Sequence, residues 1–164
     1  MYLTDFISAD SIHTQLRGAS PIHLFEEVVD RWIESDRLLA SYREPALVAL
    51  LKKEAAKTTR IAPGVALPHG RISHPIPSIG ALVLNREGLD LGQGPPVQVV
   101  VVLLSPQDDS EMHLSALSAI SRVLGNADLV QEIRRMTDPR AVFRYIQEYE
   151  LDLGGGSDAE LVTS

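Results

Sequence analysis

The sequence predicts an α/β fold in which helices cover both faces of a mixed β-sheet. Two observations predict it. Apolar residues recur at helical spacing in two segments near the N-terminus and in three near the C-terminus. Between these helices the chain holds short apolar runs bounded by proline, glycine and other turn-forming residues. Strands grouped between helices in this way are typical of a sheet with helices on both sides.

The first expected element is an edge strand in the apolar stretch 2–7, followed by a polar, turn-like segment over residues 8–20. Ser20 then offers a capping side chain, and Pro21 suits the first position of a helix. The apolar face of this helix consists of Ile22, Phe25, Val28, Val29, Trp32 and Ile33. A second helix is predicted to run from near Glu44 to a point before Thr58. Its predicted buried face consists of Leu47, Val48, Leu50, Leu51 and Ala55.

Three strands are predicted in the middle of the chain. The first covers residues 65–67 and leads into a tight turn at 68–70, because a proline and a glycine interrupt the apolar run. The second covers residues 79–84 and is followed by turn-forming residues at 85–88. The third, over 97–104, is an almost unbroken β-branched run, which is typical of a central strand covered on both faces.

Three helices are predicted to complete the fold, over residues 111–124, 126–136 and 139–149. The glycine-rich, polar end at 151–164 is expected to form a flexible tail. A single domain over residues 1–150 accounts for the rest of the 164-residue chain.

The composition excludes several classes of function. A net charge of −7 and a pI of about 5.2, with no basic block longer than a pair, argue against nucleic-acid binding. The absence of cysteine excludes disulfides, thiolate metal sites and a cysteine nucleophile. No signal peptide is evident, and the longest apolar run, 99–104, is too short to span a bilayer as a helix. We therefore expect a cytoplasmic protein with no direct membrane insertion.

His69 is the first candidate for chemistry. It follows a rigid strand directly, between Pro68, which fixes a backbone dihedral, and Gly70, which removes a side chain that would crowd the imidazole. A histidine is a usable nucleophile near neutral pH because much of it is unprotonated there. A phosphoryl group on its ring stays reactive enough to be passed on. The alternative is a histidine that merely fills a turn.

His113 is the second candidate. Ser110 is a plausible N-cap for the helix that follows, with Asp109 as its competitor, and either choice puts His113 in the first turn. His113 heads an apolar stripe with Leu117 and Ile120, so its side chain is expected to point toward the sheet. A helix N-terminus favours a phosphate because its N–H groups are unpaired. A half-buried histidine bonded to a backbone carbonyl is the alternative.

Other kinds of site find little support in the sequence. His69, His74 and His113 form a conceivable zinc site, but there is no cysteine, and no HExxH segment puts two ligands on one helix face. The phosphate-binding GxxxxGK[ST] loop, the dinucleotide fingerprint GxGxxG and the GxSxG elbow are all absent. His13 and His23 are expected in surface segments.

At this point the residues resemble a known family. The stretch TTRIAPGVALPHG, residues 58–70, resembles the active-site segment of the type 2 IIA domains of the bacterial phosphotransferase system, which include the fructose, mannitol and nitrogen-regulatory IIA proteins. The stretch MHLSAL, residues 112–117, resembles the second histidine motif of that family. The resemblance covers about residues 3–149, and two motifs at this separation are a specific signal.

The resemblance implies a fold, a role and partners. The family fold is a three-layer α/β/α arrangement with a mixed β-sheet flanked by helices, in the order β-αα-βββ-ααα. By the same resemblance, the phosphocarrier protein HPr phosphorylates His69, His113 contacts the phosphoryl group, and no metal, nucleotide or other cofactor takes part. The next acceptor is a IIB domain in the sugar-transport branch. In the nitrogen-regulatory branch, phosphorylation controls binding to a target protein.

Three further residues are candidates for holding the phosphoryl oxygens. Lys53 stands where family members often have arginine, Arg60 stands where they often have glycine, and Ser110 lies at the helix end beside His113. Ala62 also replaces a family glycine, which restricts the loop if that glycine has a positive φ. Three functions remain open: a phosphotransferase acting as a phosphocarrier, a regulatory module, and a relative that is no longer phosphorylated.

Overall fold

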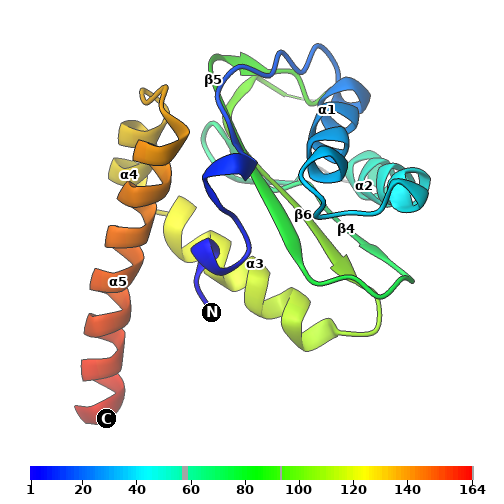
Figure 1. Ribbon diagram of the computed structural model, residues 1–164. Coiled ribbons are helices and arrows are strands. Elements are labelled where there is room, and N and C mark those ends of the chain that lie inside the picture. Colours follow the sequence, from blue (N-terminus) through cyan, green and yellow to red (C-terminus); the bar gives the residue numbers. More distant parts are fainter. Residues whose placement is uncertain (57–58, 93, 164) are drawn as a thin grey trace.

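The computed structural model in Figure 1 describes the backbone of residues 1–56, 59–92 and 94–163, and their side chains except those of 53–56 and 155–163. The elements, in chain order, are η1 (Leu3–Asp5), η2 (Ala9–Ser11), β1 (Ile12–His13), α1 (Pro21–Glu34), η3 (Ala40–Tyr42), α2 (Arg43–Ala56), β2 (Arg60–Ala62), β3 (Val65–Ala66), β4 (His69–Ile72), β5 (Ile79–Leu89), β6 (Val97–Pro106), α3 (Ser110–Leu124), α4 (Ala127–Ile133) and α5 (Pro139–Thr163), where η marks a short 3-10 helix.

The strands form one mixed sheet in the order β1-β5-β6-β3-β2, with β4 paired to β6 beyond β3. β6 runs antiparallel to β5 and parallel to β3 and β4. β1 is parallel to β5, and β2 is antiparallel to β3. The short strands β3 and β4 therefore follow one another along the same edge of β6.

Helices cover both faces of this sheet, which confirms the predicted three-layer α/β/α fold. α1 and α2 pack on one face, and α3, α4 and α5 pack on the other (Figure 1). Side chains of β6 alternate between the two layers, with Val101 and Leu103 in the core of α3–α5 and Val102 and Leu104 in the core of α1–α2. All four are fully buried, as expected for a central strand.

The strand expected at residues 2–7 is wrong. This segment forms η1 and a loop, because its backbone N–H groups bond to the Glu150 side chain or to oxygen atoms within the segment rather than to a neighbouring strand. The buried carboxylate of Glu150 on α5 accepts from the N–H groups of Leu3, at 2.5 Å, and Thr4, at 3.0 Å. These hydrogen bonds hold the N-terminus against α5. The first strand of the chain is β1, over Ile12–His13.

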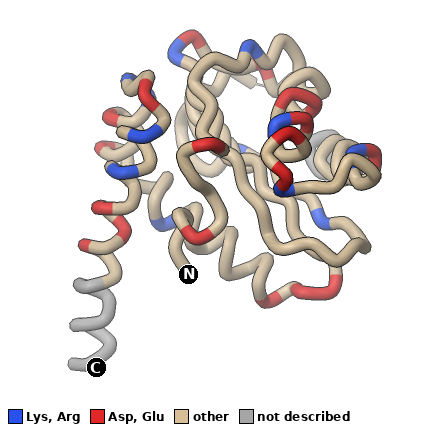
Figure 2. Tube along the Cα trace, in the orientation of Figure 1, with Lys and Arg blue, Asp and Glu red and all other residues tan. Residues whose placement is uncertain are grey.

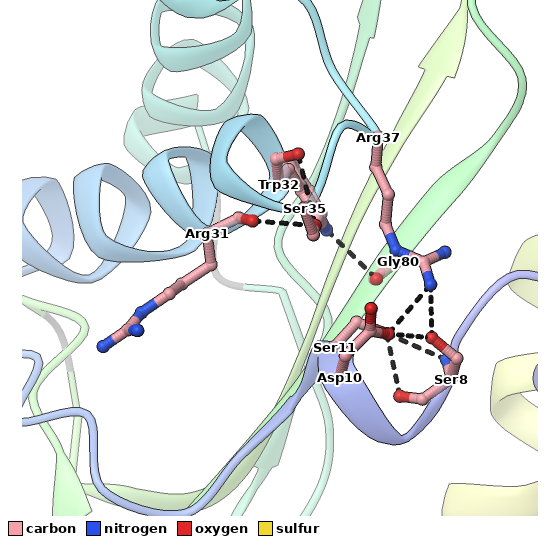
Figure 3. A network of polar contacts seen from close by, with 8 residues as sticks. All are labelled: Ser8, Asp10, Ser11, Arg31, Trp32, Ser35, Arg37 and Gly80. Carbon is pink, nitrogen blue, oxygen red and sulfur yellow. Dashed lines mark hydrogen bonds and ion pairs between the residues drawn. The ribbon is translucent and has the colours of Figure 1, made fainter.

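The next part of the N-terminal segment is fastened to the end of α1. Figure 3 shows the guanidinium of Arg37 beside Ser8 and Asp10, with an Arg37–Asp10 distance of 2.8 Å. The Trp32 indole N–H donates to the carbonyl oxygen of Gly80 at 3.1 Å, which fixes α1 to the start of β5. These contacts fix the start of the polar segment, and α1, to the sheet.

Other boundaries differ from the sequence prediction. β5 continues through the expected turn at 85–88, as an irregular strand in which the Asn85 side chain accepts from the N–H groups of Glu87 and Gly88. Val48 is 54% exposed rather than on the buried face of α2. α4 is shorter than predicted, and α5 includes residues 151–163, so the division into a domain and a tail stays a prediction. Within the described residues, no helix is long and apolar enough to cross a membrane.

Candidate functional site

His69 is the first residue of β4, not part of a tight turn as predicted. Its strand partner is Leu103 of β6, whose N–H donates to the carbonyl oxygen of Pro68 at 3.0 Å. Along this edge of β6, Val65 and Leu67 pack in the α3–α5 layer, while Ala66 and Ile72 pack in the α1–α2 layer. By this alternation, the half-buried His69 side chain lies on the α3 side.

A backbone contact fixes the orientation of the His69 ring. Its Nδ1 lies 2.7 Å from the carbonyl oxygen of Leu67. Because a carbonyl oxygen only accepts hydrogen bonds, Nδ1 is the nitrogen that donates here. In the neutral ring the lone pair is then on Nε2, which makes Nε2 the nucleophilic atom.

His113 lies in the first turn of α3 and is buried, as the apolar stripe predicts. Asp109, not Ser110, is the N-cap, and its carboxylate accepts from the Met112 N–H at 2.9 Å. The rings of His69 and His113 lie 5.7 Å apart between centroids, with planes tilted by 44°. The structure therefore brings together the two histidines that the sequence singles out.

Arg71 is a further residue of this site that the sequence analysis missed. Two residues after His69 on β4, it lies on the same side of the strand. Its Nη2 donates to the Gln107 carbonyl oxygen at 2.6 Å and to the Ser110 hydroxyl at 2.9 Å. It brings a positive charge to the start of α3. A basic residue two positions from a strand histidine is the signal that was available in the sequence.

The other predicted site residues lie at different places. Ser110 lies at the start of α3, where its exposed hydroxyl accepts from Arg71. The Arg60 guanidinium lies against Gly94, where a Cβ would be 3.1 Å from Nη2, and so toward the loop before β6. Lys53 belongs to α2, and its side chain is outside the described part of the structure. The phosphoryl-holding roles of these three residues stay predictions.

Gly70 is needed for a different reason from the one predicted. It lies on the opposite side of β4 from His69, against α2. A Cβ at Gly70 would lie 2.9 Å from the carbonyl carbon of Ala49, so it would meet helix backbone rather than an imidazole. Ala62 carries no backbone penalty, because Asp36 is the only described residue other than glycine with a positive φ.

We expect Gly70→Ala to lower the free energy of unfolding by about 2 kcal/mol, because β4 and α2 must move apart. Urea denaturation measures the change. Ser73→Ala, at an exposed position just after β4, is the matched control and is expected to leave stability within about 0.5 kcal/mol of the original. An equally stable Gly70→Ala variant would contradict the close approach of β4 to α2.

The zinc alternative gains no support from the structure. His74 packs its ring against Tyr42, at 4.5 Å between centroids. Where the structure describes the side chains, no three histidine, aspartate or glutamate residues are grouped so that they could hold a metal ion.

A comparison with protein families shows which family has this fold. Residues 5–149 match the model of the phosphoenolpyruvate-dependent sugar phosphotransferase system, EIIA 2. The chain belongs to this family. The membership confirms the resemblance seen in the sequence, and it assigns the chain to a family of phosphoryl-transfer components.

Relatives of this EIIA 2 domain come from both branches of the family. It is 28% identical to a nitrogen regulatory protein of Bradyrhizobium diazoefficiens, over 87% of this chain and 93% of that protein. It is 21% identical to the fructose-specific EIIABC component of Bacillus subtilis, over 92% of this chain and 24% of that protein.

Solved structures share its fold. The nitrogen regulatory protein IIA-Ntr of Neisseria meningitidis has a TM-score of 0.75 and 23% identity, and the match covers 88% of this chain and 98% of that one. The mannitol IIA of Escherichia coli, in a complex with phosphorylated IIB, has a TM-score of 0.71 and 13% identity, and the match covers 87% and 97%.

Proposed function

We propose that this EIIA 2 domain is a phosphocarrier that accepts a phosphoryl group from HPr on Nε2 of His69 and passes it on to a IIB domain or uses it as a regulatory signal. The observation that carries the proposal is the His69–His113 pair, with His69 Nδ1 held at 2.7 Å by the Leu67 carbonyl oxygen. Family membership supports phosphoryl transfer as the type of reaction.

In the proposed step, the lone pair on Nε2 attacks the phosphorus atom and a new N–P bond forms. The bond from phosphorus to the donor nitrogen of HPr breaks, and its electron pair stays on that nitrogen. As positive charge grows on the His69 ring, the Nδ1–H bond to the Leu67 carbonyl oxygen becomes stronger. His113 contacts the phosphoryl oxygens, and the Arg71 guanidinium adds a positive charge at the start of α3.

The test is phosphoryl transfer from phosphoenolpyruvate through enzyme I and HPr to this protein. Intact mass spectrometry is expected to detect one added phosphoryl group that is lost in acid, as a phosphohistidine requires. Peptide mapping is expected to locate it on the segment containing His69. A protein that stays unlabelled, with HPr from the same organism, would instead favour a relative that is no longer phosphorylated.

We expect His113→Ala to slow phosphoryl transfer about 10²-fold, the usual effect of removing a group that stabilises a transition state. Ser118→Ala, at an exposed position further along α3, is the matched control and is expected to keep the original rate. Rapid-quench measurement of labelling gives both rates. A His113→Ala variant that is labelled at full speed would remove His113 from the proposed mechanism.

The second candidate is a nitrogen-type regulatory module, which binds a target protein according to its phosphorylation state. The match over 93% of the Bradyrhizobium nitrogen regulatory protein favours it. Pull-down with the phosphorylated and unphosphorylated forms tests it, since a regulatory module retains a partner in one form only. Transfer of the label to a IIB domain would favour the transport branch.

A further inference from the structure

A second cluster of charged side chains lies at the other end of the sheet. His69 and Gly80 both pair with Leu103, and Arg86 follows six residues further along β5. At about 3.3 Å per residue, Arg86 is roughly 20 Å from the level of the histidine pair. There the end of β5 lies beside the loop after β1 and the connection between α4 and α5, and Figure 2 shows basic segments on the end of β5 and on that connection.

These three segments line a cavity of about 310 Å³ that is open to solvent on one side. Its charged lining residues are Arg17, Arg86, Arg134 and Glu87, so the local balance is positive on a chain whose net charge is −7. The volume lies at the lower end of the range for small-molecule sites, roughly 300–1,000 Å³.

Hydrogen bonds between the segments hold the walls of this cavity. Arg86 donates to the Arg135 carbonyl oxygen at 2.8 Å, which joins β5 to the α4–α5 connection. The Asn85 amide donates to the Leu16 carbonyl oxygen at 3.2 Å, which joins β5 to the loop after β1. Thr14 closes the third side by donating to the Thr137 carbonyl oxygen at 3.1 Å. The cavity is therefore formed before any ligand arrives.

The arginines at this cavity have no carboxylate partners. None of the ion pairs among the described residues involves Arg17, Arg86 or Arg134, although Glu87 is in the same lining. Arginine side chains that line one cavity can bind phosphate or carboxylate groups, because each guanidinium presents a planar fork of N–H donors. Positive groups that lie close together repel one another, so an anion bound between them lowers the energy of the cluster.

We propose that this cavity is a binding site for a small anion with two or more negative charges, distinct from the histidine pair. Arg17 and Arg134 bind its charged groups, and Arg86 supplies a third contact while it holds the cavity wall. Glu87 opposes binding by repulsion and limits the affinity. The site needs no phosphorylation of His69, so it stands apart from the proposed phosphocarrier function.

The test is a ¹H–¹⁵N NMR titration of the whole chain, at constant ionic strength, with three probes: inorganic phosphate, pyrophosphate and citrate. We expect saturable shifts of the backbone amides around residues 14–17, 85–87 and 134–137, and none of that kind around residues 67–71. Tighter binding of pyrophosphate than of citrate would identify the phosphate class, and the reverse order the carboxylate class.

Four variants make the result specific. Arg17→Gln and Arg134→Gln, whose side chains make no hydrogen bond among the described residues, are each expected to weaken binding at least about tenfold. Glu87→Gln is expected to strengthen binding a few-fold, a gain that loss of structure cannot produce. Arg144→Gln, at an exposed position of α5 outside the cavity, is the control and is expected to change nothing. Absence of saturable shifts in the cavity with all three probes, or equal weakening by Arg144→Gln, would overturn the proposal.

Discussion

His69→Ala is expected to abolish labelling of the protein by the phosphoenolpyruvate, enzyme I and HPr system. The reason is chemical: the alanine side chain offers no lone pair, and the variant loses the ring whose Nδ1 is held by the Leu67 carbonyl oxygen and whose lone pair is therefore on Nε2. The fold is expected to survive, because the ring is only half-buried and the strand pairing of residue 69 with Leu103 uses backbone atoms. Intact mass spectrometry measures the labelled fraction, and circular dichroism checks the fold.

His74→Ala is the matched control for that experiment. His74 is also a histidine, five residues further on, but it packs against Tyr42 rather than against His113. We expect its replacement to leave the labelled fraction unchanged. Persistent labelling of His69→Ala would mean that another group is the acceptor. Loss of labelling in both variants would instead indicate damage to the surface that HPr binds.

The layered fold was predictable because its signals are local. The helical spacing of apolar residues identified α1 and α3, and the β-branched run identified β6 as the central strand, all close to their observed bounds. The errors lie where a distant contact overrides the local pattern. Residues 2–7 are apolar enough for a strand, but the Glu150 carboxylate, 147 positions away from Leu3, accepts hydrogen bonds from the N–H groups of Leu3 and Thr4. No residue near Leu3 in the sequence indicates that Glu150 is its hydrogen-bond partner.

The sequence predicted which histidines belong to the candidate site better than it predicted how they are arranged. His69 and His113 could be selected because each has a distinctive predicted setting, His69 in a turn directly after a strand and His113 in a first helical turn. The two histidines lie close together because β4 pairs with the end of β6 from which the chain continues into α3. That pairing cannot be deduced from one sequence. The same gap concealed Arg71, whose importance comes from Gln107 and Ser110 across the strand end. For the same reason the sequence predicted that Gly70 leaves room for the imidazole, whereas in the structure it lies against Ala49 of α2.

His13 carries the largest expected effect of pH on stability. The sequence analysis expected it at the surface, which is wrong: it is half-buried on β1, and its Nε2 is buried without a hydrogen-bond partner. The pKa of His13 is lowered from its ordinary 6.5 to about 4, chiefly by burial and then by the positive charge of Arg31, while the negative charge of Asp10 opposes the shift. Between about pH 6.5 and pH 4, His13 is therefore mostly neutral in the folded protein and mostly protonated in the unfolded chain.

The direction of the effect follows from this difference in proton binding. Above about pH 6.5 His13 is neutral in both states and contributes nothing. As the pH falls from about 6.5 to about 4, the unfolded chain gains a proton that the folded chain does not, so the free energy of unfolding decreases. At about 1.4 kcal/mol per pKa unit the total loss is about 3 kcal/mol, and it levels off below about pH 4, where both states are protonated.

Urea denaturation at a series of pH values measures this loss, with His13→Gln and His23→Gln as a matched pair. Glutamine cannot take up the proton, so His13→Gln is expected to remove about 3 kcal/mol of the decrease between pH 7 and pH 4. His23 is exposed on α1, and its replacement is expected to keep the pH dependence of the original protein. If His13→Gln keeps it too, water reaches the His13 ring in the folded protein, and the acid sensitivity arises elsewhere in the chain.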